Sequence, residues 1–283
     1  MRSFWSIRRR WGQPRPRRLP ILGVNGAGKT CLAWGIGRYL SDSGYGQPSV
    51  ETARYFYEID PFMLRNAPIP ASVQKQPLVL QVNTVVLNRG GLQRELPVRL
   101  VISSHDTPGG ELVEVTNVLQ TPTPDGPLAH PIVRQFFSLV VNADGLLVVV
   151  DLARRLRTRE EFAALSPTER EDHLRAALAE QVAPLCRGIE TAIQMNTSMR
   201  GKPIFFIFTK ADIHCLPVAQ VRSLIHTAYS ILFNRLRHQG IECHEHCVAY
   251  AGSTRDADGS LSYRIEGVEE LLADLALCFA EER

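Results

Sequence analysis

The sequence has no long apolar run. Its 283 residues are 45% hydrophobic and 22% charged, which is the ordinary composition of a globular domain. The most apolar stretch, "FSLVVNADGLLVVVDLA", is interrupted by Asn142, Asp144, Gly145 and Asp151. A membrane-spanning helix needs about 20 consecutive, predominantly apolar residues. We therefore predict that the chain contains no transmembrane helix.

Cysteine is also scarce. Six cysteines are scattered along the chain without paired spacing. A disulfide framework is typical of short secreted chains with regularly spaced cysteines. We therefore expect reduced thiols and a cytoplasmic location.

Acidic residues are missing from the first 18 positions, "MRSFWSIRRRWGQPRPRR", which hold seven arginines. The formal net charge of +3 therefore comes from this end of the chain. No apolar core follows the arginines, which excludes a secretory signal. Interleaved aromatic and basic residues suit an anionic membrane surface, which would make the protein peripheral at a membrane, or an acidic partner. A solvated arm is an equally open interpretation, and no specific nucleic acid is predicted.

Apolar periodicity predicts strands that alternate with helices. Strands are expected at "RLPILG", "LVLQVNTVVLN", "LPVRLVIS", "GLLVVVD", "PIFFIF" and "IECHEHCVAYAGS". Helices are expected over about 29–40, 154–199 (in more than one piece), 217–240 and 268–279. "NRGG" predicts a hairpin turn, whereas 41–77 and 116–131 read as irregular segments. This alternation predicts an α/β fold with a mostly parallel sheet.

The stretch "GVNGAGKT" at 23–30 is the strongest motif, because it matches G-x-x-x-x-G-K-[ST] between a predicted strand and a predicted helix. Glycines let backbone N–H groups approach a phosphate, and the helix N-terminus adds favourable partial charge. Lys29 would neutralise phosphate oxygens, and the Thr30 hydroxyl would bind Mg²⁺. The predicted nucleotide contacts in this segment are Gly23, Asn25, Gly26, Ala27, Gly28, Lys29, Thr30 and Cys31. Cys31 itself is expected to be a small packed residue.

Three further motifs follow in order: "DTPGGE" at 106–111, "TKAD" at 209–212 and "AYAGS" at 249–253. With them, the chain from Gly23 to about Ser253 resembles a Ras-like, translation-factor-related P-loop GTPase of bacterial type with enlarged switch regions. The resemblance implies one three-layer α/β GTPase domain over 19–283, preceded by a basic tail over 1–18. Its sheet would have six strands, mostly parallel, with one antiparallel strand. Insertions are assigned to about 41–77, 112–135 and 154–199.

The resemblance also implies roles around the γ-phosphate. Asp106 would hold Mg²⁺ through water, and the Gly109 N–H would bond the γ-phosphate. The first switch would add a hydroxyl ligand for Mg²⁺, for which Ser72 is chosen and Thr52 is the alternative. Either of these two could instead be a solvated loop residue, and that reading is favoured for Thr52. Lys29, Gly109 and Glu111 are the predicted catalytic residues.

The base would be read by the third motif. The Asp212 carboxylate would accept two hydrogen bonds from guanine, which adenine cannot donate on that edge. The Lys210 stem would pack over the base, and Thr209 stands where such proteins more often have Asn. Ser253 would contact the base from the weak fourth motif. GTP and GDP are therefore the expected ligands.

The residue after D-x-x-G is Gly110, whereas Ras-like members often place there a Gln that orients water. Hydrolysis should therefore be slow unless Glu111 or a protein partner supplies the missing group. The sequence predicts a Mg²⁺-dependent GTP switch that is read by a protein effector or activator through its switch loops. A nucleotide-bound scaffold with negligible hydrolysis and a P-loop ATPase of a multi-protein assembly remain as alternatives.

The segment "CHEHC" at 243–247 suggests a zinc site. On a strand, however, the two histidines point to one face and the two cysteines to the other. We therefore predict a structural strand here rather than a metal site.

Overall fold

We describe the chain from a computed structural model, which covers residues 15–64, 77–89, 92–105, 111–120, 126, 129–154, 159–255 and 261–279. These residues form one eight-stranded sheet with the order β2-β3-β4-β1-β5-β6-β7-β8. The strands are β1 (Arg17–Gly23), β2 (Gly46–Pro48), β3 (Pro77–Arg89), β4 (Leu92–His105), β5 (Leu146–Asp151), β6 (Ile204–Thr209), β7 (Cys243–Arg255) and β8 (Leu261–Glu266).

The predicted six strands are the inner ones, and the expected six-stranded count is wrong because a short strand is added at each edge. β4, β1, β5, β6 and β7 pair in parallel, while β3 runs antiparallel to β4. β2 and β8 add two further antiparallel pairings, where one antiparallel strand was expected. β2 is only three residues long, so its sequence is too short to show the alternation of apolar and polar residues that predicts a strand. β8 pairs with the part of β7 that extends beyond the end of β6.

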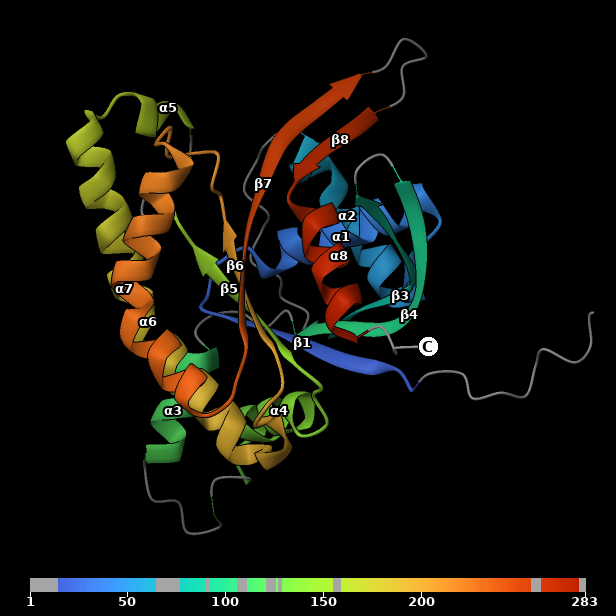
Figure 1. The fold of residues 1–283 in the computed structure, drawn as a ribbon, viewed down its shortest axis with the longest axis vertical. Coiled ribbons are helices and arrows are strands. Elements are labelled where there is room, and N and C mark those ends of the chain that lie inside the picture. Colours follow the sequence, from blue (N-terminus) through green and yellow to red (C-terminus); the bar gives the residue numbers. More distant parts are fainter. Residues whose placement is uncertain are drawn as a thin grey trace, which may run out of the picture.

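Helices cover both faces of the sheet, which gives the three predicted layers (Figure 1). α1, α2 and α8 lie on one side, and α3, α4, α6 and α7 lie on the other. The helices are α1 (Lys29–Ser43), α2 (Val50–Leu64), α3 (Glu111–Gln120), α4 (Pro131–Val140), α5 (Arg159–Ala163), α6 (Pro167–Met195), α7 (Val218–His238) and α8 (Val268–Phe279). The charged region 154–199 is more than one helix, as predicted. None of the helices described here is long and apolar enough to span a bilayer.

The segment 41–77 contains a helix where its prolines suggested an irregular loop. Residues 50–64 form α2, which contains Pro61 and buries Phe56, Ile59 and Met63. These positions recur every three or four residues, which is the spacing of one helix face. The helix is joined to α1 because Trp34 Nε1 donates to Asp60 Oδ1 at 2.7 Å. The second irregular segment also begins in a helix, since α3 runs to Gln120.

The centre of the sheet is buried on both faces. All six residues of β5 and all six of β6 are buried, which is expected of parallel strands covered by helices. In such open α/β sheets, ligands bind outside the carboxyl ends of the strands. The phosphate loop follows the carboxyl end of β1, and the predicted base-reading motif at 209–212 begins at the carboxyl end of β6.

The predicted basic tail overlaps the sheet by two residues, since β1 begins at Arg17. The Arg18 backbone N–H donates to the Asp144 carboxylate at 3.0 Å, and the Arg17 guanidinium lies 3.7 Å from the same side chain. Residues 1–14 lie outside the described ranges. The role of the tail in binding a membrane or an acidic partner stays a prediction.

Candidate nucleotide-binding site

The phosphate loop connects β1 to α1 and depends on its glycines. Gly26 and Gly28 have φ values of 75° and 89°, the left-handed region in which side chains other than glycine are strained. At Gly23, an added Cβ would lie 2.9 Å from the Val149 carbonyl oxygen on the neighbouring strand. The motif glycines therefore allow both the turn and the close approach of β5.

The Lys29 side chain folds back over this loop. Its Nζ donates to the carbonyl oxygens of Gly23 at 3.1 Å and Val24 at 3.2 Å. A phosphate placed in the loop would meet this ammonium together with the N-terminus of α1. Thr30 is half-buried in the first turn of α1, and Cys31 is exposed. The expectation of a packed Cys31 is therefore wrong, because this position lies on the outer side of the helix.

A hydrogen bond joins the phosphate loop to the predicted base-reading motif. The Thr209 hydroxyl, at the end of β6, lies 2.8 Å from the Ala27 carbonyl oxygen and donates to it. Both residues are buried. A Cβ at Gly28 would lie 3.6 Å from the Thr209 oxygen, which is an ordinary contact distance, so the positive φ rather than lack of space requires the glycine. Two motifs 182 residues apart in the sequence therefore lie in direct contact.

Lys210 is held by an acid that the sequence reasoning did not select. Its Nζ donates to Oδ2 of Asp151 at 2.7 Å, and its φ is 61°. Asp151 is 2% exposed at the end of β5, and its other oxygen accepts the Ala153 N–H. Gln181, on α6, bonds both backbone groups of Asp151. The signal that could have found Asp151 is a carboxylate that directly ends an apolar strand.

The other two predicted base contacts, Asp212 and Ser253, lie in different kinds of structure. Asp212 lies in the turn that follows Lys210. Ser253 is not in a loop, because it pairs with Tyr263 of β8 within β7. This agrees with the strand expected over 241–253, while the base contact that the resemblance implies for Ser253 stays a prediction. The pairing of β7 with β6 ends at Val248, which pairs with Thr209. The start of the segment 249–253 therefore still lies next to the predicted base-reading motif.

The switch residues are only partly described. Asp106, Gly109, Gly110 and Ser72 lie outside the described ranges, and Glu111 is the first residue of α3. The other candidate for the first switch, Thr52, is 1% exposed, so the solvated-loop interpretation is wrong. Its oxygen accepts the Val79 N–H at 2.9 Å, which connects α2 to β3. Thr52 therefore has a structural role that occupies its oxygen.

His214 is a second buried residue near the base motif that the sequence did not single out. Its ring is fully buried and stands edge-on to Phe162, with ring centroids 4.7 Å apart. Burial lowers the pKa of His214 to about 4. The imidazole is thus neutral in the folded protein at neutral pH.

This low pKa predicts a loss of stability in mild acid. Between about pH 6.5 and pH 4 the unfolded chain binds a proton at this histidine that the folded chain does not, so the free energy of unfolding falls as pH falls. At about 1.4 kcal/mol per pKa unit, the contribution is about 3 kcal/mol. Denaturant unfolding of wild type and His214→Leu between pH 7 and pH 4 measures it, with His238→Leu as a control for removing a histidine. Equal pH slopes for wild type and His214→Leu would contradict the assignment.

No protein-family model and no curated protein matches the chain. Among solved structures, it aligns over 94% of its length with a bacterial selenocysteine-specific elongation factor EF-Sec, at 16% identity and a TM-score of 0.40. It aligns over 94% of its length with the signal recognition particle receptor SRb, in its GTP/SRX complex from Chaetomium thermophilum, at 14% identity and a TM-score of 0.44. A third match is the GTP-bound Ski7 GTPase-like domain from S. cerevisiae, at 15% identity, 95% coverage and a TM-score of 0.43.

The chain spans 29% of the elongation factor's length, 51% of the Ski7 chain and 99% of the receptor chain. All three identities are low.

Proposed function

We propose that the protein is a Mg²⁺-dependent GTP-binding switch with slow intrinsic hydrolysis. The observation that carries this proposal is the hydrogen bond from Thr209 to Ala27, which joins the base motif to the phosphate loop. A nucleotide that lay along this junction would have its phosphates at the N-terminus of α1 and its base beside Lys210 and Asp212. The two recognition elements are thus close enough for one ligand.

The residues present fit a magnesium ion. Thr30 lies in the first turn of α1, directly after the lysine that faces the loop. β4 pairs in parallel with β1 and ends at His105, so the carboxyl end of β4 lies on the same side of the sheet as the phosphate loop, and Asp106 is the next residue in the sequence. A hydroxyl and a carboxylate are the oxygen ligands that Mg²⁺ takes beside phosphates. When bound, the ion would neutralise phosphate charge.

We further propose that a protein partner reads the nucleotide state through the segments around 65–76 and 106–110. α2 leads directly into the first of these segments and exposes Val50 and Tyr57, which are 66% and 71% exposed. α3 begins directly after the second. Exposed apolar side chains on a helix that leads into such a segment suit contact with another protein. We keep a cytoplasmic location, with peripheral membrane contact through the basic tail, as part of this proposal.

The phosphate loop is tested by Lys29→Ala. Loss of a charge-assisted hydrogen bond costs about 1.5–3 kcal/mol, so GTP should bind about 10- to 100-fold more weakly. Titration of fluorescent GTP in Mg²⁺ buffer measures the dissociation constant. Lys202→Ala is the matched control. Lys202 is also half-buried and donates to a backbone carbonyl, that of Ala143, but it lies at the amino end of β6, away from the phosphate loop. Wild-type GTP affinity in folded Lys29→Ala would rule out this loop as the site.

Three measurements separate the alternatives: nucleotide titration, turnover with partners, and pull-downs in the two nucleotide states. A scaffold would bind GTP and show no turnover with any partner, whereas an ATPase would prefer adenine nucleotides. The proposed switch should bind GTP and GDP with different consequences for partner binding. Pull-downs with the protein held in its GDP form and in its GTP-analogue form would reveal that difference.

A further inference from the structure

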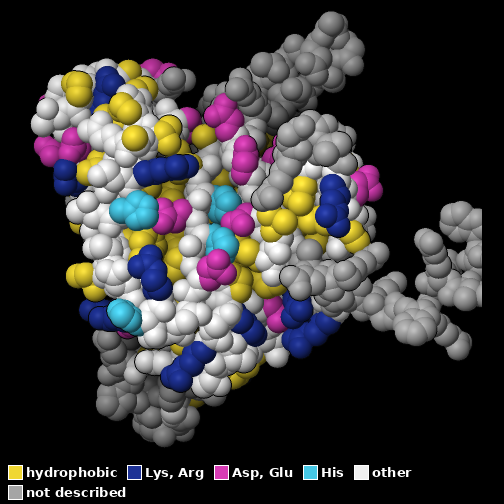
Figure 2. Space-filling model, in the orientation of Figure 1, with side chains coloured by type: hydrophobic (Ala, Val, Ile, Leu, Met, Phe, Trp, Pro, Cys, Tyr) yellow, Lys and Arg dark blue, Asp and Glu magenta, His cyan; other side chains and the backbone are white. Residues whose placement is uncertain are grey.

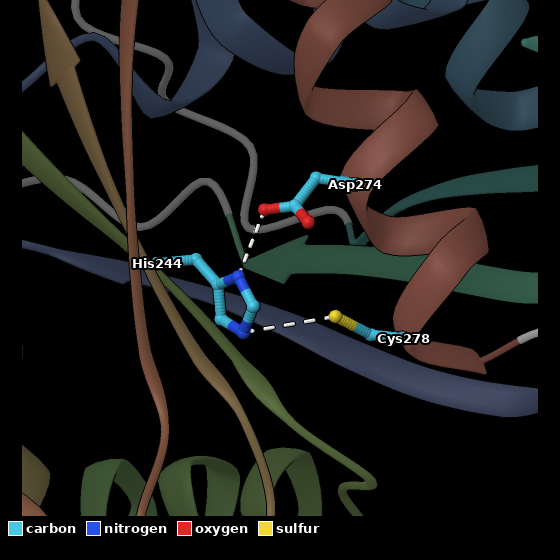
Figure 3. A group of neighbouring side chains, drawn as sticks. All are labelled: His244, Asp274 and Cys278. Atoms are coloured by element: carbon cyan, nitrogen blue, oxygen red, sulfur yellow. Dashed lines mark hydrogen bonds and ion pairs between the residues drawn. The ribbon is translucent and has the colours of Figure 1, made fainter.

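A cluster of potential metal ligands lies between the last parallel strand and the last helix, away from the phosphate loop. His244 and His246 occupy the same face of β7, and both rings contact Oδ2 of Asp274 on α8, each at 2.9 Å. Cys278 lies one helical turn beyond Asp274, with its Sγ 3.6 Å from Nε2 of His244 (Figure 3). On this face of the molecule, histidine and acidic side chains gather over the seam between β7 and α8 (Figure 2).

Hydrogen bonding determines which atom of His244 could bind a metal. An ionised carboxylate only accepts hydrogen bonds, so the Nδ1 that contacts Asp274 carries the proton in the neutral ring. The lone pair of Nε2 then faces the Cys278 sulfur. The His244 ring is also stacked on Phe205, with centroids 4.6 Å apart. A carboxylate behind a histidine is the usual arrangement for orienting a metal ligand.

The spacing of the outward groups agrees with shared coordination. Zinc binds histidine nitrogen at about 2.0–2.1 Å and cysteine sulfur at about 2.3 Å, which places the two ligand atoms about 3.6 Å apart in a tetrahedral site. The observed separation of His244 Nε2 and Cys278 Sγ is 3.6 Å. A third group approaches the same nitrogen, since Oε1 of Glu242 lies 3.7 Å from it. The side chain of Glu242 is 76% exposed and can therefore adjust.

We propose that His244, Cys278 and Glu242 bind a divalent transition metal of the zinc class, with Asp274 orienting the His244 ring. Water would occupy the fourth position, because Glu242 brings the site to the surface. Binding replaces the thiol proton of Cys278 with the metal, and the proton is released to solvent. The ion would tie the end of the parallel sheet to α8 and so stabilise the C-terminal part of the fold.

The cluster is not explained by a reactive cysteine, because the Cys278 thiol on its own is a poor nucleophile. Burial, with added effects of Asp274 and Glu242, raises the pKa of Cys278 to about 12. The metal-free thiol is therefore protonated at neutral pH and is a poor nucleophile. The same two carboxylates favour a cation. The segment 243–247 was predicted to be a structural strand, and it cannot supply all the ligands by itself, because Cys243 and Cys247 lie on the face of β7 opposite to His244. The two proposed ligands outside that segment are Cys278, on α8, and Glu242, the residue directly before β7.

Cobalt(II) titration of the full-length, chelator-treated protein tests the site. We expect one equivalent of Co²⁺ to produce the thiolate-to-cobalt absorption band, and Zn²⁺ to displace it. Cys278→Ser should abolish the band, while Cys243→Ser, which changes a cysteine on the same strand as His244 but on its opposite face, should retain it. Asp274→Asn should weaken Co²⁺ affinity about 10- to 100-fold while retaining the band. Glu242→Ala should weaken Co²⁺ binding as well.

A band that survives in Cys278→Ser, or no band in the wild type, would overturn the proposal. Unchanged affinity in Glu242→Ala would remove Glu242 from the ligand set. Circular dichroism and GTP binding establish that each variant is folded. If Cys278→Ser does not fold, Asp274→Asn decides, because it leaves all three proposed ligands in place. Zinc should also raise the Tm of the wild type and not that of Cys278→Ser.

Discussion

Single-turnover hydrolysis of GTP by the purified chain should be slower than about one per minute, against about 1–10³ per second for typical enzymes. The reason is Gly110, which follows the D-x-x-G motif and has no side chain to orient water. The phosphate loop, with Mg²⁺ when it is bound, would still stabilise charge on the transferred phosphoryl group. Binding should therefore survive while water positioning is lost.

A partner that supplies the missing polar group or an arginine should accelerate the reaction about 10³- to 10⁵-fold, which is the effect of such residues in related chemistry. Gly110→Gln should raise the rate of the isolated chain. The partner hypothesis expects Glu111→Ala to leave that rate unchanged, whereas the prediction of Glu111 as a catalytic residue expects it to fall. Glu111 is the first residue of α3, so it belongs to a helix that begins directly after the motif. Fast hydrolysis by the wild type that is lost in Glu111→Ala would make Glu111 the catalytic residue and would refute the partner hypothesis.

Replacement of Asp212 should remove the preference for guanine. Each hydrogen bond to its charged carboxylate is worth about 1.5–3 kcal/mol, so GTP should outcompete ATP at least about tenfold in the wild type. Asp212→Asn should reduce this ratio to near one by weakening GTP binding. Asp151 is not proposed to contact the base; it forms an ion pair with Lys210 at 2.7 Å and so fixes the position of that lysine side chain.

Competition of GTP, ATP and xanthosine triphosphate for labelled GDP measures this selectivity. An asparagine amide can donate to the second base oxygen of xanthine, so Asp212→Asn should gain affinity for xanthosine triphosphate as it loses affinity for GTP. Asp172→Asn, an acid on α6, is a control for the change of charge. Equal affinity of the wild type for ATP and GTP would contradict the GTPase interpretation and favour the ATPase alternative.

Several features of the site could be predicted because they depend on local chemistry. The phosphate loop requires glycines at positions with positive φ and a lysine at the start of a helix, and both requirements are visible in "GVNGAGKT". The buried strands β5 and β6 are continuous apolar runs, which makes them readable without the fold. α2 was missed because the prolines of 41–77 indicated a loop, whereas burial of Phe56, Ile59 and Met63 against the core overrides that local signal.

The sequence by itself determined the type of fold, the phosphate-binding loop and the order of the motifs, because each follows from residues adjacent in the chain. Tertiary structure decided which distant residues meet. It brought Thr209 to Ala27 and Lys210 to Asp151, and it added β2 and β8 at the sheet edges. It also placed His244 of β7 beside Cys278 of α8. Such contacts depend on packing between elements, and no local pattern of apolar or charged residues specifies them.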